Sequence, residues 1–365
     1  MPTDRRRRLR VLIDGTPLLG QRTGIGRYTA ALAEELASRS DVDIRAVAFT
    51  LRGWRALRSV LPHGVWARGL PCSARLLRQC WLRSDYPPVE LIAGFSDIVH
   101  GTNFVLPVAA RAGGVLTIHD LAFLDAPDEL PPSDRDLPAL VLRSARRADV
   151  VCTPTEAVAT AVRERLGVPA ERVMVTPLGV DPAWFAARPA SPEVRERLGL
   201  PKEYLLFVGA EGPRKGLDIL RKAHQSTAEL PPLVLTGPGR SGVDGRVLRT
   251  GYLPEVDLRS VVAGAAAVVL PSRDEGFGLP VLEALACNVP VVCSDVPALR
   301  EVAGGQATLV PYGDPDALAA ALVSAIADPP GADVLAARRT HAAGFTWRRC
   351  AEATVSAYQH AALSR

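Results

Sequence analysis

The chain has 365 residues, of which 48% are hydrophobic and 22% charged, and its formal net charge at pH 7 is +4. The length suggests two domains, the composition is that of an ordinary globular protein, and so small a net charge gives no reason to expect a nucleic-acid partner. No apolar stretch approaches the ~20 residues that a membrane-spanning helix needs. The six cysteines lack metal-site spacing, so we expect mostly buried free thiols in a reducing cytoplasm.

The chain is expected to begin with a basic tail over residues 1–8 and a buried strand, LRVLIDG. Asp14 interrupts the apolar run too early for a signal peptide. A glycine loop that contains Gly24 and Gly26 then leads into an amphipathic helix with Tyr28 on its apolar side. Strand, glycine loop and helix open a nucleotide-binding α/β unit, but the loop is not GxGxxG. The second strand, VDIRAVAFT, does not end in the acidic residue that would bind the ribose of NAD, which disfavours an oxidoreductase.

Residues 44–84 contain eight arginines and no acidic residue, and Trp54, Trp66 and Trp81 are interleaved with them. Such a segment suits an anionic acceptor or a membrane surface. A surface helix pair in an arginine-rich chain is the simpler explanation, and both interpretations stay open.

His119-Asp120 follows the apolar run Val115–Ile118. This pair therefore lies at the carboxyl end of a predicted strand, where open α/β sheets bind ligands. A lone histidine is more often structural, but the position of His119 favours a site residue.

The second half opens with EYLLFVGAEGPRKGLDIL, again strand, loop and helix. Arg214 and Lys215 sit where the loop meets the helix. Two cations beside a helix N-terminus would neutralise a diphosphate, with arginine giving bidentate contacts and lysine a point charge. One basic pair is a weak signal by itself.

The strongest pattern is SRDEGFGLPVLEALACNVPVVCSD, from Ser272 to Asp295. It predicts a glycine loop, a helix over about Pro280–Cys287, and a buried strand. A loop that feeds a helix N-terminus presents free amides to an anion. Glu275 and Glu283 would repel a phosphate, so we expect each to bind hydroxyl groups beside it, a sugar at Glu275 and a ribose at Glu283.

In the form EGFGLPVLEAL, with two glutamates separated by seven residues, this motif resembles the family-4 retaining glycosyltransferases of the GT-B fold. TGIGRY and His119-Asp120 are similar to the bacterial mannosyl- and rhamnosyltransferase group of that family. The resemblance covers nearly the whole chain after the tail and implies an α/β GT-B fold, with two doubly wound Rossmann-like domains facing across a cleft. The implied divisions are an acceptor-binding domain over 1–176, a linker over 177–190, a nucleotide-sugar-binding domain over 191–344, and a helix over 345–365 that crosses back to the first domain.

The resemblance also implies roles for single residues. His119 would lie beside the reactive carbon of the donor sugar, Glu275 would contact that sugar, and Glu283 the ribose. Arg214 and Lys215 would stabilise the leaving diphosphate. The other donor-site residues would be Gly24, Gly26, Gly209, Tyr252, Leu253, Gly276, Phe277, Gly278 and Leu279.

Three positions depart from the family pattern. An acidic residue is frequent at Gly212, asparagine at Gly216, and glycine at Asn288. The first two departures predict a more flexible loop and leave the donor's identity open. Asparagine is tolerated at a helix end such as Asn288.

The expected reaction moves a hexose from a GDP-, UDP- or dTDP-sugar to a hydroxyl of a glycan, a lipid-linked glycan or a natural-product scaffold, with retention of configuration. By family analogy the leaving phosphate takes the acceptor's proton. No DxD-type metal site stands out, so we expect no metal and no cofactor beyond the nucleotide-sugar co-substrate. The expected location is the cytoplasm, with a peripheral place at the inner face of the membrane if residues 44–84 bind lipid. A non-catalytic nucleotide-sugar-binding protein and a GT-B phosphorylase or epimerase remain open as alternatives.

Overall fold

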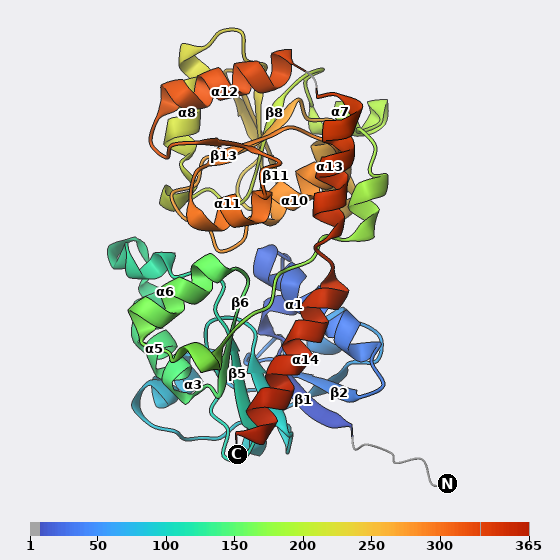
Figure 1. Cartoon of the computed structure of the whole chain (residues 1–365). Coiled ribbons are helices and arrows are strands. Elements are labelled where there is room, and N and C mark those ends of the chain that lie inside the picture. Colours follow the sequence, from blue (N-terminus) through green and yellow to red (C-terminus); the bar gives the residue numbers. More distant parts are fainter. Residues whose placement is uncertain (1–7, 329, 365) are drawn as a thin grey trace. The chain divides into compact units, whose positions relative to one another are not determined.

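The computed structural model describes residues 8–328 and 330–364 and divides into two compact units (Figure 1). Unit 1 comprises Met1–Leu178 together with Trp347–Arg365, and unit 2 comprises Gly179–Thr346. Apart from Arg8, the expected basic tail lies outside the described residues.

Unit 1 is built on a parallel sheet. Its strands in sheet order are β3 (Trp66–Arg68), β2 (Val42–Val47), β1 (Leu9–Asp14), β4 (Ile98–Gly101), β5 (Gly113–Thr117), β6 (Val150–Thr153) and β7 (Val173–Val175). Its helices are α1 (Gly24–Ala37), α2 (Leu57–Val60), α3 (Ala74–Arg83), α4 (Glu90–Ala93), α5 (Leu137–Arg147), α6 (Glu156–Leu166) and α14 (Trp347–Leu363).

The two faces of this sheet carry different helices because side chains alternate along a strand. Leu12, Val99 and Leu116 pack into one core with side chains of α3, α5 and α6. The neighbouring residues His100 and Thr117 point the other way, toward α14 and α1. The C-terminal helix α14 thus belongs to the core of unit 1, where it lies against α1 and the central strands (Figure 1).

Unit 2 repeats the plan with a sheet that is parallel except at β10. Its strands in sheet order are β10 (Gly242–Asp244), β11 (Val247–Gly251), β9 (Leu233–Thr236), β8 (Leu205–Val208), β12 (Ala267–Leu270), β13 (Val291–Ser294) and β14 (Thr308–Val310). Its helices are α7 (Pro192–Leu198), α8 (Leu217–Ser226), α9 (Glu255–Ala263), α10 (Leu279–Ala286), α11 (Pro297–Ala303), α12 (Pro315–Ala327) and α13 (Ala332–Ala343).

Both sheets have the doubly wound strand order, in which the chain reverses direction across the sheet between two neighbouring strands. The reversal falls between β1 and β4 in unit 1 and between β8 and β12 in unit 2. This confirms the expected α/β class with two Rossmann-like sheets. Ligands of such sheets bind at the carboxyl ends of the strands beside the reversal, so the loops after these strands are the first place to look for a site.

The helix expected at Pro280–Cys287 is α10, which spans Leu279–Ala286 with a proline in its first turn. Asn288 follows it with φ 62°, in the left-handed region that glycine and asparagine tolerate best. The strand expected next is β13, whose residues are all buried.

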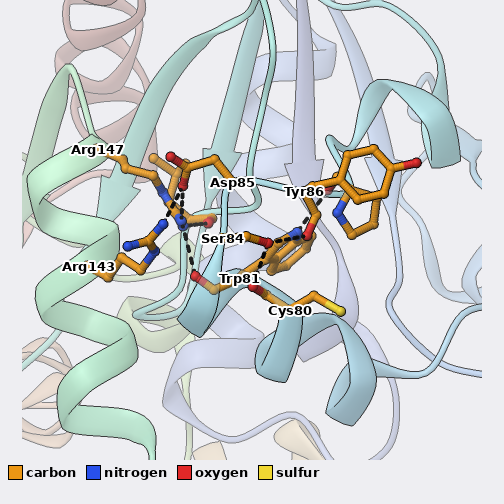
Figure 2. A network of polar contacts seen from close by, with 9 residues as sticks. Cys80, Trp81, Ser84, Asp85, Tyr86, Arg143 and Arg147 are labelled. Carbon is orange, nitrogen blue, oxygen red and sulfur yellow. Dashed lines mark hydrogen bonds and ion pairs between the residues drawn. The ribbon is translucent and has the colours of Figure 1, made fainter.

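The connection between α3 and α4 is fixed by a polar network (Figure 2). Asp85 Oδ1 accepts hydrogen bonds from Arg143 at 3.0 Å and from Arg147 at 3.1 Å, both on α5. Trp81 is buried and donates from its indole nitrogen to the Pro87 carbonyl at 2.9 Å. The end of the arginine-rich segment therefore has a structural role, because these contacts hold the connection after α3 in place against α5.

The expectation of buried thiols is wrong for Cys80, which is exposed on α3, and holds fully for Cys152, Cys293 and Cys350. No single described helix is both long and apolar enough to cross a membrane; one bent pair, α12 with the segment Ala332–Leu363, meets those two criteria by length and composition only.

Candidate active site

Two loops of unit 2 meet at the carboxyl ends of β8 and β12. The amide of Arg273 donates to the Arg214 carbonyl at 2.7 Å, and the Arg214 guanidinium donates to the Asp274 carbonyl at 3.1 Å. Gly216 has φ 62°, and a Cβ there would lie 2.0 Å from the carbonyl oxygen of Pro271. The missing side chain of Gly216 therefore lets the two loops pack closely, a packing role that the expectation of a more flexible loop did not include.

The carboxylate of Glu275 lies at the centre of this junction and is 9% exposed. Its Oε1 accepts hydrogen bonds from Lys215 Nζ at 2.6 Å and from Ser272 Oγ at 2.8 Å. Arg214 Nη1 lies 3.6 Å from Oε2. The structure thus brings three of the predicted catalytic residues, Arg214, Lys215 and Glu275, into one cluster.

Glu275 is ionised in this setting. Burial raises the pKa of its carboxyl group, but the charges of Lys215 and Arg214 and the hydrogen bonds from Lys215 and Ser272 outweigh burial and leave the pKa below its ordinary value. Two cations and one anion give the cluster a net charge of +1. The Glu275 carboxylate can therefore accept hydrogen bonds from hydroxyl groups, while the cluster as a whole still attracts an anion.

The glycine loop delivers Glu275 to the start of α10. Gly278 has φ 89°, and a Cβ there would lie 2.5 Å from Leu299 Cδ2, so this turn needs a glycine. Phe277 is buried with its ring edge-to-face on Phe345 at 5.9 Å, which anchors the loop. The turn places the amide of Leu279 at the N-terminus of α10, where it favours an anion; Pro280 has no amide hydrogen, and the amide of Val281 donates to the Gly278 carbonyl at 2.9 Å.

The other donor-site residues predicted in unit 2 follow the carboxyl ends of its strands or lie on α10. Gly209 directly follows β8, and Gly276 lies in the loop before α10. Tyr252 and Leu253 follow β11; Tyr252 is 37% exposed and Leu253 is buried. Glu283 is 1% exposed and lies one turn into α10.

His119 lies in unit 1, directly beyond β5, and is 8% exposed. Its Nε2 lies 2.9 Å from the Thr102 carbonyl oxygen. A carbonyl can only accept, so Nε2 carries a proton and Nδ1 of the neutral ring is an acceptor. Burial lowers the pKa of His119, against the opposing effects of the Thr102 hydrogen bond and the Asp120 charge. The neutral ring is therefore the stable form at pH 7.

Two aromatic rings hold the imidazole of His119. Tyr28 packs edge-to-face on it at 4.9 Å between ring centroids, and Phe104 does so at 5.7 Å. Phe104 has φ 61°, which is costly for a bulky residue. Backbone strain of this kind concentrates at functional sites.

Gly24 and Gly26 form the first turn of α1 rather than a loop before it. A Cβ at Gly26 would lie 2.7 Å from the Pro17 carbonyl oxygen, whereas Gly24 has open space around it. The amides of this first turn have no intrahelical partner and can bind an anion.

Sequence reasoning missed Phe104 and its neighbour Asn103. Asn103 Oδ1 is buried and, in the described part of the chain, accepts no hydrogen bond. A buried oxygen of this kind costs free energy unless a ligand satisfies it. The one available signal was position, because Thr-Asn-Phe follows β4 at the carboxyl edge of the sheet.

The segment 44–84 does not form a single basic-aromatic surface. Trp81 is a core residue, whereas Trp66 is 64% exposed. Arg45 pairs with Asp43 at 2.6 Å and Arg78 with Asp134 at 3.3 Å. The arginines that remain exposed are Arg52, Arg55, Arg58, Arg68, Arg75 and Arg83.

Across the described ranges, no group of three or more His, Cys, Asp or Glu side chains is placed to hold a metal ion.

Comparison with known proteins places this geometry in a family. A domain model described as "Glycosyl transferase 4-like domain" matches residues 23–179, and one described as "Glycosyl transferases group 1" matches residues 202–328. The O-antigen chain mannosyltransferase B of Escherichia coli is 28% identical over 96% of this chain and 100% of its own. The D-inositol 3-phosphate glycosyltransferase of Thermobispora bispora is 31% identical over 94% of this chain and 91% of its own.

Solved structures agree on the fold. The sucrose-phosphate synthase of Thermosynechococcus elongatus superposes with a TM-score of 0.74 at 20% identity, covering 98% of this chain and 100% of the other. The Anabaena protein HepE, solved in complex with UDP and glucose, superposes with a TM-score of 0.68 at 18% identity, covering 95% and 98%. From its sequence relatives, its two matched domain models and its two sheets, the chain belongs to the family-4 glycosyltransferases of the GT-B fold.

Proposed function

We propose that this glycosyltransferase moves a hexose from a nucleoside-diphosphate sugar to an acceptor hydroxyl with retention of configuration. The observation that carries the proposal is the cluster of Glu275, Lys215 and Arg214 beside the N-terminus of α10. It offers an ionised carboxylate for sugar hydroxyls together with a net positive charge and the positive end of the α10 dipole for a diphosphate.

Each residue has a distinct part in the proposal. Glu275 accepts hydrogen bonds from the donor sugar, and Glu283, buried on α10, accepts those of the ribose. Lys215 and Arg214 stabilise the negative charge that develops as the nucleoside diphosphate leaves. His119 is neutral with Nδ1 as an acceptor, so it serves a hydroxyl of the donor sugar rather than a phosphate.

The chemical step needs no nucleophile from the protein. The bond between the anomeric carbon and the diphosphate oxygen breaks, the acceptor oxygen bonds to the same face of that carbon, and the departing phosphate oxygen takes the acceptor's proton. The two basic side chains supply the charge that a metal ion would otherwise supply, so we propose that turnover is independent of metal. Turnover that persists after EDTA treatment and is unchanged by added Mg²⁺ or Mn²⁺ supports this part, and loss with EDTA that Mg²⁺ or Mn²⁺ restores contradicts it.

Support for the donor and acceptor classes comes from the relatives. The Escherichia coli relative is named as an O-antigen chain mannosyltransferase, and HepE was solved with UDP-glucose in a further structure. We propose a glycan, a lipid-linked glycan or a natural-product scaffold as acceptor, drawn to the exposed arginines of residues 44–84 where it is anionic.

The test is a donor screen by calorimetry with UDP-, GDP- and dTDP-hexoses, followed by measurement of nucleoside diphosphate released. Glu275→Gln and Lys215→Met are the informative variants. Glu352→Gln is the matched control because Glu352 lies in an exposed ion pair with Arg348 on α14. Binding of one nucleotide class that is lost in both variants and kept in the control supports the proposal.

Two other outcomes would overturn it. Binding without release of nucleoside diphosphate under any acceptor tested would indicate a binding protein, and turnover that requires inorganic phosphate would indicate a phosphorylase. Retention itself is checked by the anomeric configuration of the product in NMR, where an inverted product contradicts the mechanism.

A further inference from the structure

A buried chain of hydrogen bonds crosses unit 1 from its last helix to its first. Tyr358 of α14 lies with its hydroxyl 2.7 Å from Nδ1 of His100 on β4. His100 Nε2 lies 2.7 Å from Thr117 Oγ1 on β5, and Thr117 Oγ1 lies 2.9 Å from the hydroxyl of Tyr28 on α1. All four side chains are at most 1% exposed.

The protonation state of His100 determines how the hydrogen bonds in this network run. Burial lowers the pKa of His100 to about 3, so the ring is neutral and donates from one nitrogen while accepting at the other. His100 therefore donates a hydrogen bond to one of the two hydroxyls, of Tyr358 or Thr117, and accepts a hydrogen bond from the other. Removal of one hydroxyl leaves a buried partner unsatisfied.

Tyr28 is where this network meets the predicted catalytic histidine. Its ring packs edge-to-face on His119 at 4.9 Å and 80°. Its ring centroid also lies 6.4 Å from that of Trp347, the first residue of α14. Helix α14 thus reaches Tyr28 twice, directly through Trp347 and indirectly through Tyr358, His100 and Thr117.

We propose that Tyr28 is a positioning residue that holds the imidazole of His119 in an orientation set by α14. The hydrogen bond with Thr117 holds the hydroxyl end of Tyr28 and so fixes where its ring lies, and His119 is held between that ring and Phe104. With Nε2 bound to the Thr102 carbonyl, the ring has one way to present Nδ1. This inference rests on the proposed function for its effect on catalysis, although its structural part can be measured without turnover.

The informative variants keep shape and remove hydrogen bonds. Tyr28→Phe keeps the ring and loses its bond to Thr117, Thr117→Val removes the central hydroxyl, and Thr117→Ser keeps it. We expect Tyr28→Phe and Thr117→Val to lower kcat about 10-fold with the donor KM changed less than about 2-fold, since small misplacements at a reacting centre affect kcat. Thr117→Ser should restore most of the activity.

A readout independent of activity is the ¹⁵N–¹H spectrum of the imidazoles, assigned with His119→Gln. The wild type should show a slowly exchanging Nε2–H for His119, and both hydroxyl-removing variants should broaden or shift it. If the protein has no transferase turnover at all, this spectrum still decides the positioning role, so the failure of the two proposals can be told apart.

The matched control is Tyr204→Phe in unit 2. Tyr204 is 1% exposed and donates from its hydroxyl to the Val261 carbonyl at 2.6 Å, so the variant loses the same group from an equally buried place. It should leave kcat and the His119 signal unchanged.

The end of the network is tested with Tyr358→Phe. If the network acts as a unit, Tyr28→Phe with Tyr358→Phe should lower kcat about as much as Tyr28→Phe alone, not by the product of the two effects. A wild-type His119 signal and wild-type kcat in folded Tyr28→Phe would overturn the proposal, as would independent multiplication of the two effects.

Discussion

The ammonium of Lys215 lies 2.6 Å from Oε1 of Glu275, so a residue of the β8 loop and a residue of the β12 loop form one nearly buried ion pair. The pair ties together two loops that are 60 residues apart in sequence. Together with Arg214, the pair gives the candidate site its net charge of +1.

Lys215→Met should lower the free energy of unfolding by about 2 to 3 kcal/mol, because it leaves the Glu275 carboxylate buried without its nearest cation. The double variant with Glu275→Gln should recover most of that loss but no donor binding. Urea denaturation and calorimetry measure the two effects. The control is Arg259→Met, which breaks an exposed pair with Glu255 and should change the free energy of unfolding by no more than about 0.5 kcal/mol. An equal loss of stability in Lys215→Met and Arg259→Met would contradict the argument.

Gly216→Ala should cost more than about 2 kcal/mol and weaken donor binding. Its φ of 62° disfavours any side chain, and its Cβ would lie 2.0 Å from the Pro271 carbonyl oxygen. Gly212→Ala in the same loop is the control, since Gly212 is extended with φ −172° and has no heavy atom within 4 Å of its Cβ position. Equal stability of the two variants would show that the loops do not pack as described.

Phe104→Gly should be more stable than Phe104→Ala by about 1 kcal/mol, the reverse of the usual order, because φ at this position is 61°. Both should lower kcat by removing the ring that contacts His119. At Phe123, which is buried and lies in a right-handed 3₁₀ turn, whereas Phe104 is half-buried, alanine should be the better replacement. Thermal unfolding of the four variants decides the matter.

Asn103→Ala should leave stability unchanged or slightly raised, since it removes a buried oxygen that the described residues do not satisfy. If a ligand uses that oxygen, donor or acceptor affinity should fall about 10-fold, the effect of one lost hydrogen bond. Ser144→Ala on α5 removes another such oxygen away from the strand ends and should leave affinity unchanged. Identical kinetics for the two variants would remove Asn103 from the site.

Stability should fall as the pH is lowered from about 6.5 toward 3. The pKa of His100 is about 3 in the folded chain, below its ordinary value of 6.5, so in this window the unfolded chain binds a proton that the folded chain does not. The contribution is at most about 1.4 kcal/mol per pH unit for one histidine. His100→Gln should flatten the pH dependence of unfolding and His63→Gln, at an exposed position, should not.

The fold could be predicted from the sequence because the patterns that indicate strands, loops and helix ends are local. Short apolar runs, several of them leading into glycine-containing loops, predicted most strands of both units, and Pro280 and Asn288 marked the two ends of α10 to within one residue. The same local signals led to Glu275, Lys215 and His119 as predicted site residues.

What the sequence did not reveal depends on contacts between distant segments. Nothing near Tyr358 indicates that its hydroxyl meets His100, 258 residues earlier. Trp81 looked like a surface residue because its neighbours are arginines, but its orientation on α3 places it in the core. The strained backbone of Phe104 has no local sequence signature, since a phenylalanine is not a residue that favours positive φ.

The uneven burial of the six thiols favours chemical labelling at Cys80, which is exposed while Cys72 and Cys287 are half-buried and the other three are buried. Burial raises the pKa of Cys152, Cys293 and Cys350 to about 12, which slows their reaction with maleimides at neutral pH, whereas Cys80 is exposed on α3. A fluorophore attached through Cys80 would sit within residues 44–84. Its emission in the presence of anionic vesicles would then report directly whether that segment meets a lipid surface.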